Sequence, residues 1–168
     1  MSETFEPKIT TGTFDMKGRR LVTSCADGTV KIWNFSNGQQ LKELVSWDKN
    51  PRVDTEITAL IGICDPNSDK KENFHSRVKP PQFLAVGWDK KLHLWVDTAL
   101  RSDDEGDEDE DDAVACRDIP ARGKPPEHLN DIMSCCFDLK NLLIFTGGVD
   151  GTIIGWNFET SFPRYKLH

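Results

Sequence analysis

The chain of 168 residues is long enough for one domain with a hydrophobic core. Its formal charge of −7 is concentrated in one stretch, because nine of the ten residues from 103 to 112 are acidic and the rest holds 21 basic against 19 acidic residues. The folded part therefore lacks the basic footprint of a nucleic-acid binder, and the absence of an apolar run of about 18 residues argues against a membrane-spanning helix.

The first group of predicted elements occupies residues 8–45. Turn residues stand at Asp15 to Gly18, at Asp27-Gly28 and at Asn37-Gly38, with runs of strand length between them. An Asp-Gly pair between apolar runs is a strong hairpin signal, because glycine tolerates the positive φ of a type I′ turn. The pattern predicts an antiparallel meander with strands at 9–14, 20–25, 29–34 and 40–45.

The second group occupies residues 56–119 and the third 128–168. The run 56–64 is apolar on both faces, which is typical of a strand packed between neighbouring sheets. A charged insert at 65–81 reads as a surface loop, and the acidic loop 102–112 follows later in the same group. No long segment has a 3.6-residue apolar period, so we expect almost no helix. Further strands are predicted at 83–87, 91–96, within 113–119, and at 132–137, 142–147, 152–157 and 164–167.

A turn followed by a strand that ends in tryptophan occurs three times. Trp33, Trp95 and Trp156 lie 62 and 61 residues apart. Residues 14–35 and 137–158 align without gaps at an offset of 123, and ten of these 22 positions are identical. This self-similarity indicates an internal duplication and a repeat architecture.

The stretch from Thr146 to Asn157 resembles the signature of WD-repeat β-propellers. The resemblance implies an all-β fold, a partial β-propeller with three four-stranded antiparallel blades in an open arc, forming one WD-repeat region over 1–168. Propellers usually close with four to eight blades. We therefore expect a fragment or isoform of a larger propeller protein, or a chain that pairs with a second one. Residues 85–92 together with 128–132 also resemble large multi-blade WD-repeat proteins of cilia and flagella.

The same resemblance implies a hydrogen-bonded set that locks each blade. In this family the set contains a His before the first strand, a Ser or Thr on the second, an Asp at the following turn and a Trp on the third. The third unit has all four, the first has three, and the second has two, with Ala85 in place of the Thr. The second blade should then be the least locked of the three, or its Asp89 should be more solvated. The expected set is His128, Thr146, Asp150, Trp156, Thr23, Asp27, Trp33, Asp89 and Trp95.

The residue types His128, Thr146 and Asp150 also occur in nucleophile triads. A structural network is the favoured interpretation, because the Thr and the Asp recur in the repeat frame. The other histidines show no ligand spacing, and His93 corresponds to Lys31, which predicts that it faces out of the sheet. We expect no catalytic residue, no metal site and no cofactor.

The cysteines are five in number, without a Cys-x-x-Cys pair, which favours reduced thiols in a cytosolic compartment. Cys64, Cys135 and Cys136 lie on strands predicted to be buried, where cysteine behaves as a small hydrophobe. Residues 1–6 lack the features of a signal peptide. We expect a cytoplasmic location, and the narrower resemblance adds the cilium or flagellar axoneme.

The acidic loop and the rim aromatic Trp88 are the two candidate partner contacts. The loop fails as an EF-hand, since Gly106 at the sixth position would place Arg101 first. A solvated loop is the favoured interpretation, and a contact with a basic partner through Asp107, Glu108 and Asp109 is the alternative. Trp88 stands where Ala26 and Val149 stand in the other units, so it either anchors a partner or packs beneath a loop.

The sequence predicts a non-enzymatic protein–protein interaction scaffold, because a propeller presents binding loops on rigid sheets. Its expected partners are other proteins, including the remaining blades of a parent propeller or a second chain, and neither nucleic acid nor membrane. The alternative is a binder of basic proteins, similar to a histone chaperone, through residues 103–112. An enzyme is disfavoured because no nucleophile, metal or phosphate-loop spacing is present.

Overall fold

The computed structural model describes residues 8–15, 18–44, 56–64, 82–96, 116–120 and 127–168. These residues form twelve strands in three separate antiparallel sheets of four strands each, and none of them is helical. The all-β fold predicted from the sequence is confirmed. No helix in the described part is long and apolar enough to span a bilayer.

The first sheet, blade one, contains β1 (Ile9–Phe14), β2 (Arg20–Cys25), β3 (Val30–Asn34) and β4 (Gln40–Leu44), hydrogen-bonded in that order. Gly28 adopts a φ of 81° at the tight turn into β3, as the Asp-Gly pair predicts. At the turn into β2, the Asp15 carboxylate accepts hydrogen bonds from the backbone N–H groups of Arg19 and Arg20. Side chains at the turns therefore set the meander.

The second sheet, blade two, contains β5 (Ile57–Ile63), β6 (Gln82–Gly87), β7 (Leu92–Val96) and β8 (Cys116–Ile119). Lys90 takes the left-handed conformation, with a φ of 64°, at the place that Gly28 holds in blade one. Leu84, Val86, Leu92 and Leu94 are buried, as expected for a sheet that is covered on both faces. The insert 65–81 and the acidic loop 102–112 lie outside the described residues.

The third sheet, blade three, contains β9 (Ile132–Asp138), β10 (Leu143–Gly148), β11 (Ile153–Asn157) and β12 (Pro163–Leu167). Its registers repeat those of blade one at the offset of 123: Val30 pairs with Leu44, and Ile153 pairs with Leu167. The duplication seen in the sequence is therefore a duplication of structure.

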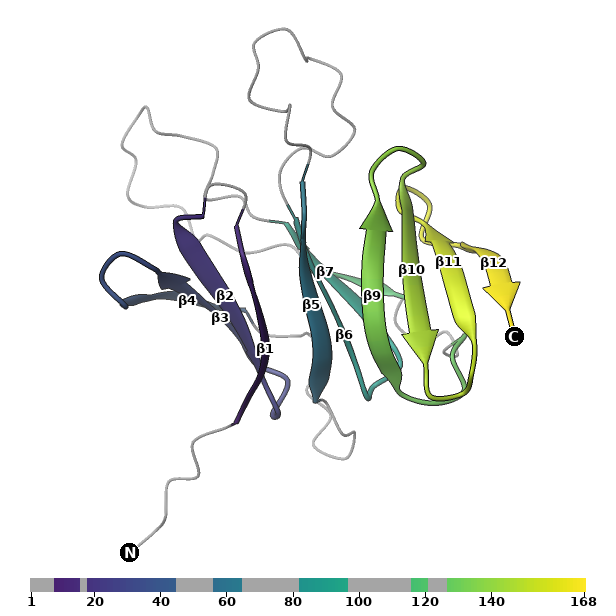
Figure 1. Cartoon of the computed structure of the whole chain (residues 1–168), viewed down its shortest axis with the longest axis horizontal. Coiled ribbons are helices and arrows are strands. Elements are labelled where there is room, and N and C mark those ends of the chain that lie inside the picture. Colours follow the sequence, from purple (N-terminus) through teal and green to yellow (C-terminus); the bar gives the residue numbers. More distant parts are fainter. Residues whose placement is uncertain (1–7, 16–17, 45–55, 65–81, 97–115, 121–126) are drawn as a thin grey trace, which may run out of the picture.

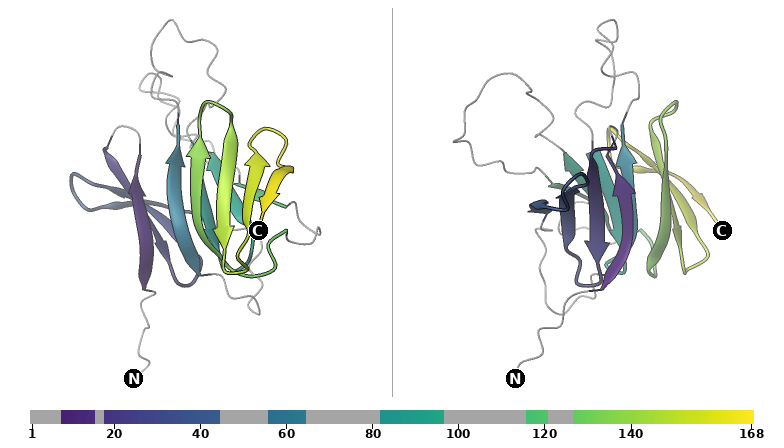
Figure 2. Two further views of the ribbon diagram at one scale, coloured as in Figure 1. Left: turned by 45° about the vertical axis from the view of Figure 1, so that its right-hand side comes forward. Right: turned by 60° about the vertical axis from the view of Figure 1, so that its left-hand side comes forward.

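The three sheets stand side by side, with β1, β5 and β9 adjacent (Figures 1 and 2). Two apolar clusters fill the interfaces. One joins blade one to blade two through Val22, Ile32, Leu60 and Trp95. The other joins blade two to blade three and includes Leu94 and Trp156. Blade two buries side chains on both faces, whereas blades one and three each bury the face turned toward blade two, and the outcome is three propeller blades in an open arc.

One burial prediction was wrong in part. Cys25 is buried, but Cys64 and Cys135 are half-buried and Cys136 is exposed. Cys136 lies on β9, where alternate side chains point to opposite faces of the sheet. Cys135 and Phe137, on either side of Cys136, pack against the buried cluster between blades two and three. The run 132–137 is apolar apart from Ser134, so its sequence did not show which face of blade three would remain uncovered.

Candidate functional site

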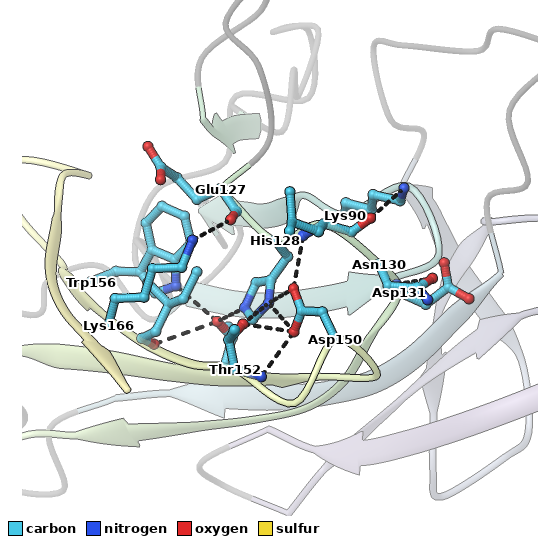
Figure 3. A network of polar contacts seen from close by, with 12 residues as sticks. Lys90, Glu127, His128, Asn130, Asp131, Asp150, Thr152, Trp156 and Lys166 are labelled. Carbon is cyan, nitrogen blue, oxygen red and sulfur yellow. Dashed lines mark hydrogen bonds and ion pairs between the residues drawn. The ribbon is translucent and has the colours of Figure 1, made fainter. Parts of the chain in front are cut away.

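Blade three contains a continuous network of polar side chains that links four segments. Trp156 on β11 donates from Nε1 to Thr146 Oγ1 on the neighbouring β10, over 2.9 Å. Thr146 Oγ1 lies 2.8 Å from Nε2 of His128, which precedes β9. The other ring nitrogen of His128 lies 3.0 Å from Thr152 Oγ1 and 3.3 Å from Asp150 Oδ2, at the turn into β11. Figure 3 shows these contacts converging on the imidazole ring.

The proton positions in this network follow from which atoms can donate. Thr152 donates to Asp150 Oδ1 over 2.6 Å, since an ionised carboxylate only accepts. Thr152 Oγ1 must then accept from His128, which places the ring proton on Nδ1. His128 Nε2 therefore accepts from the Thr146 hydroxyl, which in turn accepts from Trp156. The Ile154 carbonyl, 3.5 Å from Thr146 Oγ1, is a weaker acceptor for the Thr146 hydroxyl proton than His128 Nε2 at 2.8 Å. His128 is thus neutral.

Electrostatics agree with this assignment. Burial lowers the pKa of His128, and the attraction of Asp150 only partly offsets it. Burial alone would raise the pKa of the Asp150 carboxyl, but hydrogen bonds from the Thr152 side chain and from the N–H groups of Thr152 and Leu129 hold that pKa well below its ordinary value. The N–H of Leu129 lies 2.7 Å from Asp150 Oδ2. Asp150 therefore stays ionised and fastens the 127–131 loop to the turn.

Two lysines hold the same loop from outside. Lys166 on β12 donates to the Glu127 carbonyl over 3.1 Å, and Lys90 of blade two donates to the Leu129 carbonyl over 3.0 Å. Gly148 leaves the space for the imidazole, because a Cβ there would lie 2.7 Å from His128 Nδ1. The network therefore ties β10, β11, the 127–131 loop and the neighbouring blade together.

Among the described residues of blade one, two pieces of this network are present. Trp33 Nε1 donates to Thr23 Oγ1 over 2.8 Å, and Thr29 Oγ1 donates to Asp27 Oδ1 over 2.7 Å. The chain has no histidine before residue 75 that could join them. Asp27 is exposed, so the turn aspartate most open to solvent is in blade one and not in blade two. Of the two alternatives expected for blade two, a more solvated Asp89 was therefore wrong in the comparison with Asp27.

Blade two has a different arrangement, and the prediction that His93 faces out of the sheet was wrong. His93 is 4% exposed. Its Nε2 lies 2.6 Å from Asp89 Oδ2 and its Nδ1 lies 2.7 Å from Asp118 Oδ1. His93 and Lys31 lie on equivalent faces of their sheets. This face is uncovered in blade one, but in blade two it packs on blade one, so the exposure of Lys31 did not predict that of His93.

With one carboxylate at each ring nitrogen, His93 is positively charged. Both carboxylates accept when ionised, so both nitrogens must donate. Burial by itself lowers the pKa of His93, but the hydrogen bonds to Asp118 and Asp89 outweigh it and raise that pKa well above its ordinary value. The Asp118 carboxyl shows the reciprocal effect, since its contact with His93 lowers its pKa despite burial. Within the described residues, Asp89 is thus bound by a histidine from its own blade, in place of the upstream histidine of blade three.

Trp95 remains without its usual acceptor. Its Nε1 is buried and has no hydrogen-bond partner among the described residues. The cause is Ala85, which occupies the position of Thr23 and Thr146. The indole instead stacks on His93, with ring centroids 5.7 Å apart. An unsatisfied buried donor costs about 1–3 kcal/mol, so blade two carries a local defect.

Replacing Ala85 by serine is expected to raise the free energy of unfolding by about 1 kcal/mol, because the new hydroxyl supplies the acceptor that Trp95 lacks. Serine adds one atom and so avoids the overpacking that a threonine methyl would risk beside a fully buried Cβ. Chemical denaturation measures the change. In a Trp95→Phe background the gain should vanish, and an equal gain in both backgrounds would show that the hydroxyl acts elsewhere.

The remaining predicted site residues divide into two groups. Trp88 is half-buried, and its backbone N–H donates to the Glu56 carbonyl over 3.0 Å. Its role as a partner contact stays a prediction. Asp107, Glu108 and Asp109 lie outside the described residues. Thr146 is 1% exposed, and its hydroxyl is hydrogen-bonded to both His128 and Trp156. This arrangement favours a structural over a nucleophilic role.

Four-stranded blades with an Asp turn, a strand-ending Trp and a His–Thr–Trp network are consistent with blades of a WD-repeat propeller. Residues 4–34 and 122–157 match the family model described as WD domain, G-beta repeat. These two matches correspond to the duplicated units of blades one and three. Over these two units the chain is similar to the WD-repeat family.

The chain is similar to curated proteins that carry the name "WD repeat-containing protein on Y chromosome". It is 28% identical over 172 residues to the protein of Drosophila mojavensis, and 28% identical over 168 residues to that of Drosophila willistoni. Each alignment includes 98% of this chain. The chain spans only 11% and 12% of the length of these two relatives.

Proposed function

We propose that the chain is a non-enzymatic protein–protein interaction scaffold that forms one arc of a larger propeller assembly. The observation that supports this proposal is a difference between the two end blades. The face that one end blade buries against blade two is uncovered in the other end blade. The sheets thus present apolar surfaces of the kind that blades use to pack on one another.

The uncovered face of blade three is marked by Ile153 and Leu167, which are 48% and 57% exposed. Their equivalents in blade one, Val30 and Leu44, are 0% and 2% exposed because blade two covers them. Full burial of such a side chain contributes about 1.5–3 kcal/mol. Covering this face with a further sheet is therefore favourable.

The uncovered face of blade one is marked by an aromatic pair. Phe14 and Phe35 meet edge to face with ring centroids 5.0 Å apart, and Phe35 is 59% exposed. The equivalent rings of blade three, Phe137 and Phe158, lie 5.2 Å apart, but Phe158 is buried. Blade two covers Phe158 with Arg117, whose guanidinium lies 5.5 Å from the ring centroid and donates to the Phe158 carbonyl over 2.7 Å.

By this comparison, the Phe14–Phe35 face would bind the outer strand of another blade. That strand would carry a cationic side chain at the position of Arg117. The greater length of the curated relatives supports further blades of a longer protein as its source, and a second chain is the alternative source. The same proposal includes a cytoplasmic location, with the cilium or flagellar axoneme as the narrower assignment.

Solution size tests the proposal directly. We expect the chain to associate in sedimentation experiments, and Phe35→Asp and Leu167→Asp to weaken association at least about tenfold, or about 1.4 kcal/mol. Leu139→Asp is the matched control, because Leu139 is also an exposed apolar side chain but lies in the turn between β9 and β10. A compact 19 kDa monomer whose stability and size none of these substitutions changes would contradict the proposal.

A further inference from the structure

Four polar side chains of blade two converge where β7 and β8 pair. His93 lies directly opposite Asp118 in the antiparallel register, and Cys116 lies opposite Trp95. Positions 116 and 118 share one face of β8, and positions 93 and 95 share one face of β7. Asp89 approaches the other side of the imidazole from the turn before β7. Sheet geometry thus brings these groups together from residues far apart in the sequence.

The distances within this cluster are short. Nδ1 of His93 is 2.7 Å from Asp118 Oδ1, and Cys116 Sγ is 3.5 Å from the same oxygen. One donor atom each from His93, Cys116 and Asp118 lie within 4.8 Å of one another. We propose that these three residues bind one Zn²⁺ ion, with Asp89 orienting the imidazole.

The donor set selects the ion. Imidazole nitrogen, thiolate sulfur and carboxylate oxygen are the ligands that Zn²⁺ takes in proteins, whereas Ca²⁺ and Mg²⁺ require oxygen ligands. Tetrahedral zinc separates nitrogen and oxygen ligands by about 3.3 Å, given Zn–N and Zn–O lengths of about 2.0–2.1 Å. The His93–Asp118 pair must therefore open by about half an ångström, which a small side-chain rotation provides. Cys116 and Asp118 are half-buried, so water can take the fourth position.

The contact with Asp89 is the second structural argument. A histidine that binds metal through one nitrogen commonly donates its other N–H to a carboxylate, which fixes the tautomer and the ring orientation. Asp89 Oδ2 lies 2.6 Å from Nε2 of His93, on the side opposite Asp118 and Cys116. The imidazole is thus held so that Nδ1 points at the other two donors. Asp89 is a positioning residue in this scheme.

Charge also balances between the metal-free and metal-bound states. Without metal, two carboxylates surround an imidazolium and a neutral thiol, so the cluster carries one net negative charge. Zn²⁺ binding releases the Nδ1 proton and the thiol proton, and the net charge stays the same. Lys91 lies close enough to Asp118 to favour its ionised form, so it also opposes the approach of a cation. We expect this repulsion to moderate the affinity without preventing binding.

The repeat architecture does not require this donor set. The paired positions of His93 and Asp118 hold Lys31 and Glu43 in blade one, and Ile154 and Lys166 in blade three. Both of those blades fold with four paired strands. The donors are therefore specific to blade two, whose outer strand follows the acidic loop in sequence.

Cobalt substitution tests the proposal on the intact chain. Co²⁺ titration should give a thiolate-to-metal charge-transfer band at one equivalent, and Zn²⁺ should displace it. Cys116→Ser should abolish the band, and Asp118→Asn should weaken binding at least about tenfold. Cys136→Ser is the matched control, since this exposed thiol lies on β9, and it should leave the spectrum unchanged.

A second measurement needs no substitution. One equivalent of Zn²⁺ should slow alkylation of Cys116 in the wild-type chain at least about tenfold, read by mass spectrometry, while Cys136 reacts as before. Equal protection of several cysteines, a charge-transfer band that survives Cys116→Ser, or no band at one equivalent would each overturn the assignment. Neither readout depends on association through the uncovered blade faces, so the scaffold proposal and the zinc site fail or hold independently.

Discussion

Replacing Thr146 by valine is expected to lower the free energy of unfolding by about 2–5 kcal/mol. Valine keeps the shape of threonine but removes the hydroxyl that accepts from Trp156 Nε1 and donates to His128 Nε2. Both partners are buried, so each loses its hydrogen bond without gaining water, at about 1–3 kcal/mol per group. Denaturant unfolding followed by tryptophan fluorescence and circular dichroism measures the loss.

The duplication provides the matched control for this substitution. Thr23→Val removes the equivalent hydroxyl in blade one, where it holds only Trp33. Trp33 is half-buried, whereas Trp156 is 1% exposed, so water compensates more of the lost hydrogen bond and we expect a loss of about 1 kcal/mol or less. Equal losses for Thr146→Val and Thr23→Val would mean that the link to His128 contributes nothing to stability.

The strands could be predicted from sequence because their turns have strong local chemistry. The Asp27-Gly28 and Asp150-Gly151 pairs fix two of the tight turns, and in the structure Gly28 and Gly151 both take positive φ. The tryptophan that ends each third strand then gave the register of the repeat. Local signals of this kind survive in any tertiary context, which is why most predicted strand bounds agree with the structure to within one or two residues.

The polar groups of blade two could not be predicted in the same way. His93 was interpreted from its equivalence to Lys31, but equivalent positions in a repeat meet different neighbours. The face of blade one that carries Lys31 has no sheet against it in the described chain, whereas blade one itself covers that face of blade two. One signal was available: an alternating strand that places His93 on the same face as the buried Trp95 argues for burial.

The partners of His93 were harder still to foresee, because Cys116 and Asp118 follow a long insertion. A strand after a loop of that length has no register that the sequence can set. The three donor groups come together only once β8 pairs with β7. Sites built from cross-strand neighbours, unlike those built within a single turn, therefore need the fold before they can be seen.

Replacing Gly87 by alanine is expected to cost about 3 kcal/mol or more, which places it among the strongest single substitutions in the chain. A Cβ at this position would lie 2.1 Å from the Glu56 carbonyl oxygen and 3.1 Å from Ile57 Cα. The obstacle is backbone, so no side chain can turn away. Relief requires β5 to move, and β5 packs on both neighbouring blades. Denaturant unfolding and limited proteolysis should show the loss.

The position of Gly87 explains why glycine is needed there. The same Glu56 carbonyl accepts from the N–H of Trp88, an arrangement that Ala26 and Val149 repeat with the carbonyls of Lys8 and Asp131. Blade one accommodates Cys25 at the equivalent position, so the constraint arises from the close entry of β5 in blade two. Gly62→Ala is the control, since its Cβ would meet only the Phe14 carbonyl, at 3.4 Å, and it should cost less than about 1 kcal/mol. If Gly87→Ala were as mild as Gly62→Ala, the entry of β5 would be adjustable, and blade two would not depend on this contact.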